Sequence, residues 1–199
     1  MLRTWLHRFV AIPFVYDLVQ FLVGSAYSRR RFRQSLARCR PDSVIVDIGG
    51  GTGLNRPLLP LSARYICLDN DMIKLKGFVD KQVNGQPVLG SGATLPLKSA
   101  SVDLAICSAV IHHIPEEHLV SFAQEAMRLI KPGGAFIFLD AVWMPQRLLS
   151  KLMWRYDRGA YPRTEEVLHK LFASHGRIVH WERWSLYHVY VVGVIEPHP

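Results

Sequence analysis

Short apolar runs alternate with longer amphipathic stretches from residue 43 to the end of the chain. The runs are rich in Val, Ile and Leu and alternate poorly with polar positions, which is typical of strands covered on both faces. We interpret five of them as strands, at residues 43–49, 64–69, 87–92, 102–109 and 135–142. The stretches at 115–131 and 164–176 are predicted to be helices. This order of elements predicts an α/β fold with a mostly parallel sheet.

Both predicted helices carry start and stop signals. Pro115 suits the first helical position, and two glutamates follow it where they complement the helix dipole. The sequence KPGG, residues 131–134, is expected to stop this helix. Thr164 is placed to cap the second helix and Gly176 to end it.

The last segment, residues 176–197, differs from the rest because two apolar runs follow each other with no helix between them. Such a pair predicts an antiparallel hairpin at the sheet edge. Together with the five earlier runs it gives a sheet of seven strands, mostly parallel, with an antiparallel C-terminal hairpin strand.

The first 42 residues have a different character. An apolar stretch at 9–24 is broken by Pro13, Asp17 and Gln20, and so falls short of the ~20 uninterrupted residues that a membrane span needs. The same interruptions argue against a signal peptide. We expect residues 1–42 to form an amphipathic, basic helical segment that packs on a domain formed by residues 43–199.

Positive charge is concentrated in this segment. Residues 1–42 contain eight arginines and two aspartates, which is 8 − 2 = +6 of the total net charge of +8. An anionic membrane surface in contact with residues 9–40, a nucleic acid or an acidic substrate would suit this charge, and a solvated helix face with no partner is the plain alternative. We expect a cytoplasmic protein, with a membrane-peripheral position as the second interpretation.

The three cysteines, Cys39, Cys67 and Cys107, are far apart and form no CxxC pair. We interpret them as reduced, mostly buried thiols. The histidines show no spacing that predicts a metal site, and no metal is expected.

A glycine-rich stretch, VDIGGGTG at residues 46–53, follows the first strand and carries the main chemical signal. Glycines at such a turn let the backbone approach a ligand. The dinucleotide pattern wants a last glycine where this chain has Leu54, so a nicotinamide dinucleotide is disfavoured. A second acid, Asp69, follows 22 residues after Asp47. We expect Asp69 to accept hydrogen bonds from ribose hydroxyls and Asp47 to face the ammonium or sulfonium end of a nucleoside ligand.

Four ordered stretches resemble the class I S-adenosylmethionine-dependent methyltransferases, in particular the group that includes quinone-biosynthesis and phospholipid methyltransferases. These stretches are VDIGGGTG, LDNDMI, GSGATLPLKSASVDLAICSAVIHHIPE and EAMRLIKPGG. The resemblance runs from about Tyr16 to the closing hairpin. It implies a Rossmann-like, doubly wound sheet and S-adenosylmethionine as cofactor.

The resemblance also assigns cofactor-binding positions. It places Gly49, Gly51 and Gly53 around the methionine moiety and Asp69, followed by Asn70, at the ribose. Gly92 and Ala93 would contact the adenine through backbone groups, Ser108 would lie beside the methyl group, and Tyr16 would close over the cofactor. This sequence departs from the family pattern at Ser91, where relatives have an adenine-contacting aspartate, and we expect weaker or altered binding there.

His112 and His113 follow the fourth predicted strand, at the carboxyl edge where α/β sheets place their sites. Either could accept a proton from an acceptor at neutral pH, and we nominate His113. The alternative is that one histidine caps or packs while the other merely lines the pocket. Four aromatic residues after the fifth strand could wall an apolar acceptor pocket or belong to the core: Trp143, Trp154, Tyr156 and Tyr161.

The acceptor is less clearly indicated. The segment SAVI after the fourth strand lacks the [DNS]PP[YFW] pattern of nucleobase amine methyltransferases. We therefore expect methyl transfer to a small-molecule or lipid-like acceptor, on O, C or N. A cofactor-binding protein without catalysis remains an alternative, as does an RNA methyltransferase that uses the Arg29–Arg40 basic block, although nucleic acid is disfavoured.

Overall fold

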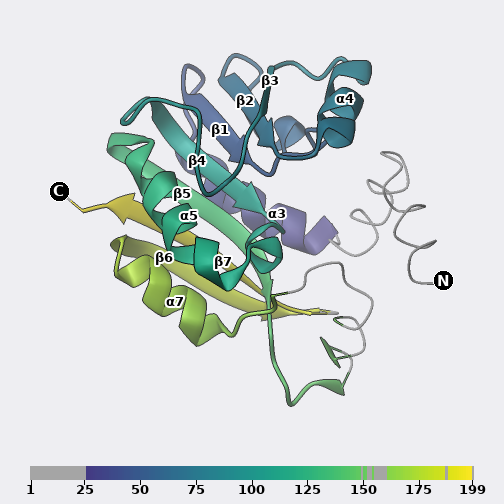
Figure 1. The fold of residues 1–199 in the computed structure, drawn as a ribbon, viewed down its shortest axis with the longest axis vertical. Helices are drawn as coiled ribbons and strands as arrows, with labels where there is room; N and C mark the ends of the chain where they lie inside the picture. The colour runs from purple at the N-terminus through teal and green to yellow at the C-terminus, as the bar shows by residue number, and fades with distance from the viewer. Residues whose placement is uncertain (1–25, 149, 152–153, 155–160, 187, 199) are drawn as a thin grey trace.

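The computed structural model describes residues 26–148, 150–151, 154, 161–186 and 188–198. Its centre is a seven-stranded sheet with the order β3-β2-β1-β4-β5-β7-β6 (Figure 1). The strands are β1 (Val44–Ile48), β2 (Arg64–Asp69), β3 (Gln86–Leu89), β4 (Val102–Ser108), β5 (Ile130–Val142), β6 (Gly176–Ser185) and β7 (Val189–Pro197).

Strands β1 to β5 are mutually parallel, whereas β7 runs antiparallel to both β5 and β6. The predicted α/β class, the seven strands and the C-terminal hairpin at the sheet edge are therefore confirmed. The strand order runs outward in opposite directions from the adjacent strands β1 and β4. The switch point, where open α/β sheets bind ligands, therefore lies between these two strands.

Four α-helices whose bounds lie within the described residues flank the sheet: α3 (Ala26–Ser35), α4 (Met72–Asp80), α5 (Glu116–Arg128) and α7 (Glu165–Ala173). Three short 3₁₀ helices join them: η1 (Leu36–Arg38), η2 (Arg56–Leu58) and η3 (Ile111–His113). Helix α4 was not among the helices predicted from the sequence. It begins after Asp71, whose carboxylate accepts hydrogen bonds from the amides of Ile73 and Lys74. Thr164 caps α7 as predicted, by accepting from the amide of Val167.

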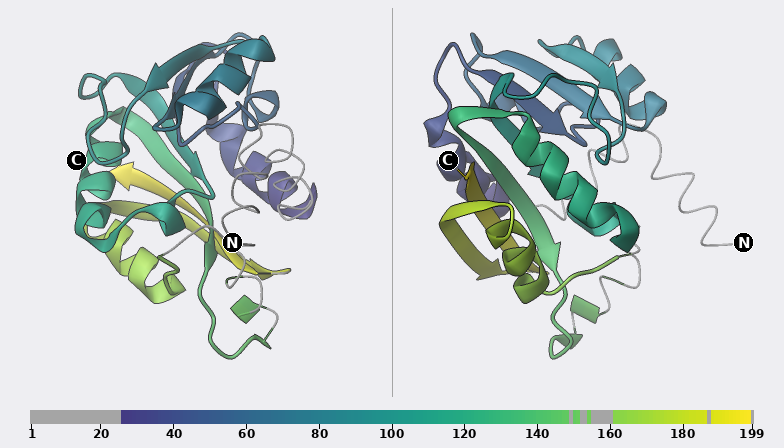
Figure 2. Two further views of the ribbon diagram at one scale, coloured as in Figure 1. Left: turned by 45° about the vertical axis from the view of Figure 1, so that its right-hand side comes forward. Right: turned by 60° about the vertical axis from the view of Figure 1, so that its left-hand side comes forward.

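Helices cover both faces of the sheet (Figure 2). On one face, Phe122 of α5 and Phe172 of α7 pack into a core with Phe136 and Phe138 of β5. On the other face, α3 and α4 bury residues such as Phe32 and Phe78 in a second core. Burial on both faces explains why the strands read as continuous apolar runs.

The predicted helix at 115–131 is shorter in the structure. Pro115 precedes the helix as its N-cap, and the last helical residue is Arg128. The KPGG sequence lies inside β5, where the register against β4 shifts between Val102 and Leu104. Gly133 has φ +79° there, a backbone conformation that glycine adopts without strain. These residues therefore form an irregularity within a strand.

All three cysteines are free thiols, with Cys67 and Cys107 buried and Cys39 partly buried. No helix of the described residues is long and apolar enough to cross a membrane. The whole apolar N-terminal stretch at 9–24, and Tyr16 with it, lies outside the described residues.

Candidate active site

The turn that follows β1 has the backbone that the glycine pattern predicts. Gly49, Gly51 and Gly53 have φ angles of +74°, +57° and +80°, in the left-handed region that side chains disfavour. The amides of Gly49 and Gly50 both donate to the carbonyl of Leu68 at the end of β2, at 2.7 and 3.0 Å. The turn is thereby fixed against the carboxyl end of the neighbouring strand.

Asp69, at the end of β2, lies beside this turn. One of its carboxylate oxygens accepts from the amide of Gly51 and the other from the amide of Asp71, both at 2.9 Å. The residue is only 3% exposed, while the adjacent Asn70 is exposed. Two backbone donors fix the orientation of the carboxylate, and its remaining lone pairs can still accept from further hydroxyl groups.

Asp47, by contrast, is completely buried within β1. Its carboxylate accepts from the hydroxyl of Tyr65 and from the side-chain amide of Asn55, the latter at 3.1 and 3.2 Å. Burial raises the pKa of Asp47 to about 6, against the opposing effect of these two hydrogen bonds. The buried position means that Asp47 would influence a cationic ligand through its charge and through Asn55.

The predicted adenine side, residues 91–93, follows β3. Ser91 is exposed, and its hydroxyl accepts from the amide of Ala93 at 3.2 Å. A hydroxyl that accepts this bond can still donate its own proton to a ring nitrogen. Gly92 lies against α5, because an added β-carbon would be 3.1 Å from Cδ2 of Phe122.

An ion pair on α5 ties the loop after these residues to the helix. Glu125 accepts from the amide of Leu95 at 2.8 Å, and Arg128 donates to the carbonyls of Leu95 and Leu97 at 3.1 and 2.9 Å. The Arg128 guanidinium also holds the pKa of Glu125 below its ordinary value. Both residues lie in the stretch EAMRLIKPGG that resembles the family, but their local sequence did not indicate a contact with the loop at 95–97.

A turn at residues 109–114, which we call the histidine turn, follows β4 and contacts the glycine turn directly. An added β-carbon on Gly49 would lie 2.3 Å from Cγ2 of Val110. Ser108 is partly buried at the end of β4, and Ala109 directly after it has φ +56°. A left-handed alanine is strained, and such strain is common at functional sites. The predicted donor and acceptor sides of the site are therefore in contact.

Of the two histidines, His112 is the one held by a carboxylate. It is 6% exposed, and its Nδ1 contacts the carboxylate of Asp140 on β5. Asp140 is buried and also accepts from the amides of Ile111, His112 and Ala141, at 2.7, 3.3 and 2.7 Å. His113, which the sequence analysis nominated as base, is exposed, and its ring centroid lies 4.2 Å from that of His112.

A buried arginine holds the other side of the histidine turn. Arg163, 6% exposed, donates to the carbonyls of Ile111 and Ile114 at 2.8 and 2.6 Å and pairs with Glu116 at 3.1 Å. The amide of Tyr161 donates to the carbonyl of His112 at 3.1 Å. Asp140 thus engages the amides of the turn, while residues 161–163 engage its carbonyls.

A tryptophan, Trp154, packs against His112. The Trp154 ring meets His112 edge-on at 5.5 Å between centroids, and Trp143 meets Trp154 at 6.5 Å. Trp154 is 8% exposed, and its buried indole nitrogen has no hydrogen-bond partner among the described residues. Tyr161 is 40% exposed, and the predicted Tyr156 lies outside the described residues. Of the four predicted aromatic residues, Trp154 therefore lies beside the histidine, and Trp143 lies beside Trp154.

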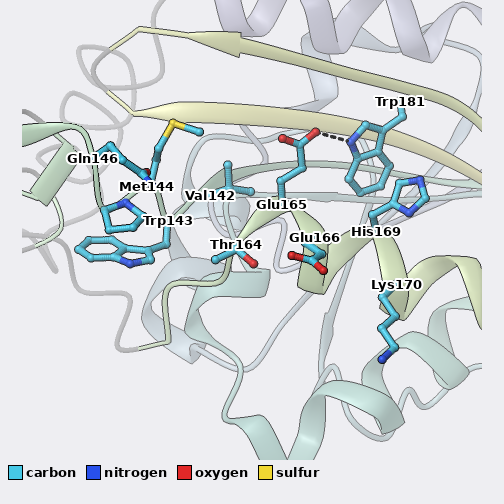
Figure 3. A pocket seen from close by; sticks show the side chains of 11 residues that line it. Val142, Trp143, Met144, Gln146, Thr164, Glu165, Glu166, His169, Lys170 and Trp181 are labelled. Atoms are coloured by element: carbon cyan, nitrogen blue, oxygen red, sulfur yellow. Dashed lines mark hydrogen bonds between the residues drawn. The ribbon is translucent and has the colours of Figure 1, made fainter.

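A groove of about 610 Å³ lies next to this cluster, between the end of β5 and α7. Figure 3 shows Trp143 and Met144 at one end, and His169 and Trp181 at the other. The indole of Trp181 donates to Glu165 at 3.0 Å. Trp143 lines the groove and packs against Trp154, which in turn packs against His112.

The N-terminal basic segment also reaches the site. Arg29 on α3 donates to the carbonyl of Leu54, directly after the glycine turn, at 3.0 Å. Arg31 pairs with Glu182, and Arg38 pairs with Glu196 at 2.7 Å. Three arginines of the basic block are thus engaged within the chain. Among the described residues, no group of His, Cys, Asp or Glu side chains is arranged to hold a metal ion.

Comparisons with known proteins agree with this geometry. A family model described as a methyltransferase domain matches residues 46–138. An uncharacterized methyltransferase of Mycobacterium sp. (strain KMS) is 29% identical over 102 residues, which covers 51% of this chain and 40% of that protein. The ubiquinone/menaquinone biosynthesis C-methyltransferase UbiE of Brucella anthropi is 26% identical over 142 residues, which covers 65% of this chain and 52% of that protein.

Solved structures share the fold. Geranyl diphosphate C-methyltransferase from Streptomyces coelicolor A3(2), solved with Mg²⁺, geranyl diphosphate and S-adenosyl-L-homocysteine, superposes with a TM-score of 0.70 at 12% identity. That match covers 87% of this chain and 80% of the other. The chain spans about half the length, or less, of the two curated relatives described above. The family match over residues 46–138 and these relatives, together with the shared fold, support a class I S-adenosylmethionine-dependent methyltransferase.

Proposed function

We propose that this protein transfers the methyl group of S-adenosylmethionine to a small-molecule or lipid-like acceptor. The observation that carries the proposal is the direct contact between the glycine turn and the histidine turn at Gly49 and Val110. This contact places a backbone suited to a charged nucleoside beside a buried histidine and carboxylate. When bound, the cofactor would supply an activated methyl group on a sulfonium, and the protein would orient the two reactants.

The cofactor side is assigned to residues that fit the ligand chemically. The glycine turn would bind the methionine moiety through its backbone, since Gly49, Gly51 and Gly53 hold left-handed conformations that glycine adopts without strain. Asp69, held by two amides, would accept from the ribose hydroxyls, with Asn70 beside it. Ser91, Gly92 and Ala93 would contact the adenine, and Ser108 would lie near the methyl group. The family assigns Tyr16 to the same cofactor.

The acceptor side is assigned to the histidine turn and the aromatic residues around it. Trp154 presents an apolar ring to His112 and Trp143 packs against Trp154, which suits an acceptor with an apolar body. The adjoining groove offers further apolar surface at Met144 and Trp181. A small-molecule or lipid-like acceptor is therefore favoured over a highly charged one.

The two alternative functions have less support. An RNA methyltransferase would use the basic block, yet Arg29, Arg31 and Arg38 are engaged within the chain. A cofactor-binding protein without catalysis would have no use for a buried histidine and carboxylate at the carboxyl edge of β4 and β5. Transfer of a labelled methyl group from the cofactor to a component of a cell extract would show that the protein is an enzyme and would exclude a cofactor-binding protein without catalysis.

Contact with a membrane surface through residues 9–40 is a separate proposal. Arg30 and Arg33 are exposed on α3 and could bind anionic headgroups. Flotation of the full chain with vesicles containing phosphatidylglycerol tests this proposal. Binding that is unchanged by the double substitution Arg30→Glu and Arg33→Glu, or no binding by the original chain, would contradict it.

Calorimetry with S-adenosylhomocysteine tests the cofactor assignment. We expect binding by the full chain and a loss of at least about tenfold in Asp69→Ala and Gly51→Val, since the first removes a carboxylate acceptor and the second fills a left-handed position. Gly133→Val is the matched control, because Gly133 also has a positive φ but lies in the β5 irregularity. No binding, or full binding by both site variants, would overturn the assignment.

A further inference from the structure

The histidine turn carries an arrangement that the proposed function does not by itself require. Methyl transfer needs a base only if the acceptor loses a proton as it attacks. His112 nevertheless has the features of a base that is oriented by a carboxylate. Its Nδ1 contacts Asp140, and Asp140 is itself fixed by the amides of Ile111, His112 and Ala141.

Three backbone donors make Asp140 an acceptor of fixed direction. Because its carboxylate accepts from amides, the proton shared with His112 lies on Nδ1, as in the Ser-His-Asp arrangement. The neutral ring then carries its lone pair on Nε2. Asp140 would also stabilise the positive imidazolium that forms when Nε2 takes a proton. The pair is therefore organised to accept a proton at Nε2.

Arg163 completes the support from the opposite side. Its guanidinium donates to the carbonyls of Ile111 and Ile114, which flank the two histidines. An arginine that is 94% buried and bonds backbone carbonyls fixes a turn more firmly than a solvated side chain would. Asp140 and Arg163 come from segments that are 28 and 51 residues away from His112 in the chain, so the fold itself brings them to the turn.

A second, independent observation concerns Trp154. Its buried indole N–H has no hydrogen-bond partner in the described chain, and its ring meets that of His112 edge-on. A buried donor without a partner is costly, so it indicates a group that completes it when the site is filled. A hydroxyl suits both neighbours, because its oxygen can accept from Trp154 while its proton is donated to His112.

We propose that the acceptor is a hydroxyl compound, that His112 is the base that takes its proton, and that Asp140 and Arg163 are positioning residues for His112. This inference rests on the proposed function. In the step, the hydroxyl O–H bond breaks and its proton passes to Nε2 of His112. The oxygen forms a bond to the methyl carbon, and the carbon–sulfur bond breaks with its electron pair retained by sulfur. The products are a methyl ether, neutral S-adenosylhomocysteine and an imidazolium that releases its proton to water.

NMR of the full chain labelled with ¹⁵N-histidine tests the base assignment without an acceptor. We expect a neutral imidazole that is protonated at Nδ1, with a strongly downfield proton, and that is assigned to His112 by its loss in His112→Gln. Asp140→Asn should abolish this signal, because the amide can donate to Nδ1 and reverse the tautomer. Arg163→Met should shift or broaden it, and Arg163→Lys should restore it only in part.

Matched controls keep the NMR test specific. His118→Gln and Arg177→Met replace exposed residues on α5 and β6 and should leave the His112 signal unchanged. Binding of S-adenosylhomocysteine reports whether each variant folds. A His112 ring protonated at Nε2, or a signal that persists in a folded Asp140→Asn variant, would overturn the proposal. Loss of cofactor binding in the unmodified chain would contradict the proposed function instead.

Labelled methyl transfer to small-molecule cell extracts tests the hydroxyl assignment. Hydriodic acid cleaves methyl ethers, so label on oxygen should be released as volatile methyl iodide. His112→Gln should lower the transfer rate by at least about 100-fold. Trp154→Phe keeps the ring but removes the donor, and should lower transfer by about tenfold while leaving the NMR signal of His112 in place. Label that stays non-volatile, or full transfer by His112→Gln, would overturn the proposal.

Discussion

Gly49 in the glycine turn and Val110 in the histidine turn lie so close that a β-carbon on Gly49 would be 2.3 Å from Cγ2 of Val110. Contacts this short do not occur, so any side chain at position 49 must displace Val110 in the histidine turn. A change that seems confined to the cofactor side therefore reaches the acceptor side as well.

This contact predicts the outcome of Gly49→Ala. The variant combines a left-handed alanine with a steric clash, so we expect a loss of about 2–4 kcal/mol in the free energy of unfolding. Gly133→Ala is the matched control, since Gly133 has φ +79° and open space around it, and should lose only about 1 kcal/mol. Adding Val110→Ala to Gly49→Ala should recover part of the loss. Equal losses for Gly49→Ala and Gly133→Ala in denaturant titrations would contradict the clash.

A second prediction concerns the buried carboxylate of Asp47. Because the pKa of Asp47 is raised from 3.8 to about 6, the contribution of Asp47 to the free energy of unfolding is fully present below pH 4 and is lost as the pH rises through 6. The shift of 6 − 3.8 = 2.2 pH units corresponds to at most about 3 kcal/mol. The free energy of unfolding of Asp47→Asn, relative to the original chain, should therefore grow between pH 4 and 6 and level off above.

Denaturant titrations from pH 4 to 8 measure this difference, and a flat difference would show that Asp47 does not titrate as expected. Tyr65→Phe provides a second check. The Tyr65 hydroxyl lowers the pKa of Asp47, so its removal should move the pH window upwards.

The strained Ala109 leads to a third prediction. Ala109→Gly relieves a left-handed alanine at φ +56°, while it adds flexibility to the unfolded chain, so the free energy of unfolding should change by between 0 and about +1 kcal/mol. Ala100→Gly, at φ +48°, should behave alike. Ala105→Gly, buried in β4, should instead destabilise by about 1–2 kcal/mol. Destabilisation by Ala109→Gly comparable to that of Ala105→Gly would contradict the strain.

Arg29 gives a prediction about cofactor binding. Arg29→Met removes the donor to the carbonyl of Leu54, so we expect S-adenosylhomocysteine to bind about fivefold more weakly, or by about 1 kcal/mol. Arg64→Met, an exposed arginine at the amino end of β2, is the control for the loss of a charge. Calorimetry measures the affinity of both variants for S-adenosylhomocysteine. Equal affinities would show that the bond from α3 to the glycine turn does not contribute to cofactor binding.

The sequence predicted those parts of the site that depend on the backbone. Glycine is the residue that adopts a left-handed turn without strain, so the spacing of Gly49, Gly51 and Gly53 fixed both the turn and its place after β1. Asp69 was predictable for a related reason, because successive parallel strands bring their carboxyl ends to one edge.

The acceptor side was less predictable because its contacts join distant segments. Asp140 reads as the last polar residue of an apolar strand, and Arg163 as a basic residue in a connecting segment. Nothing in their local sequence indicates that they engage opposite sides of the histidine turn. The choice of His113 over His112 had the same difficulty, since two adjacent histidines differ only in what the fold places beside them. Which of them serves as base stays a prediction.

The backbone bond between the amide of Trp143 and the carbonyl of Arg163, at 2.7 Å, joins the two ends of a segment of 19 intervening residues. The chain leaves β5 and returns to the histidine turn at one point. Relatives with longer or shorter segments here could therefore keep the sheet, the glycine turn and the donor chemistry unchanged. We infer that insertions and deletions between Trp143 and Arg163 can change acceptor preference. Exchanges of this segment between homologues should therefore use these two residues as their boundaries.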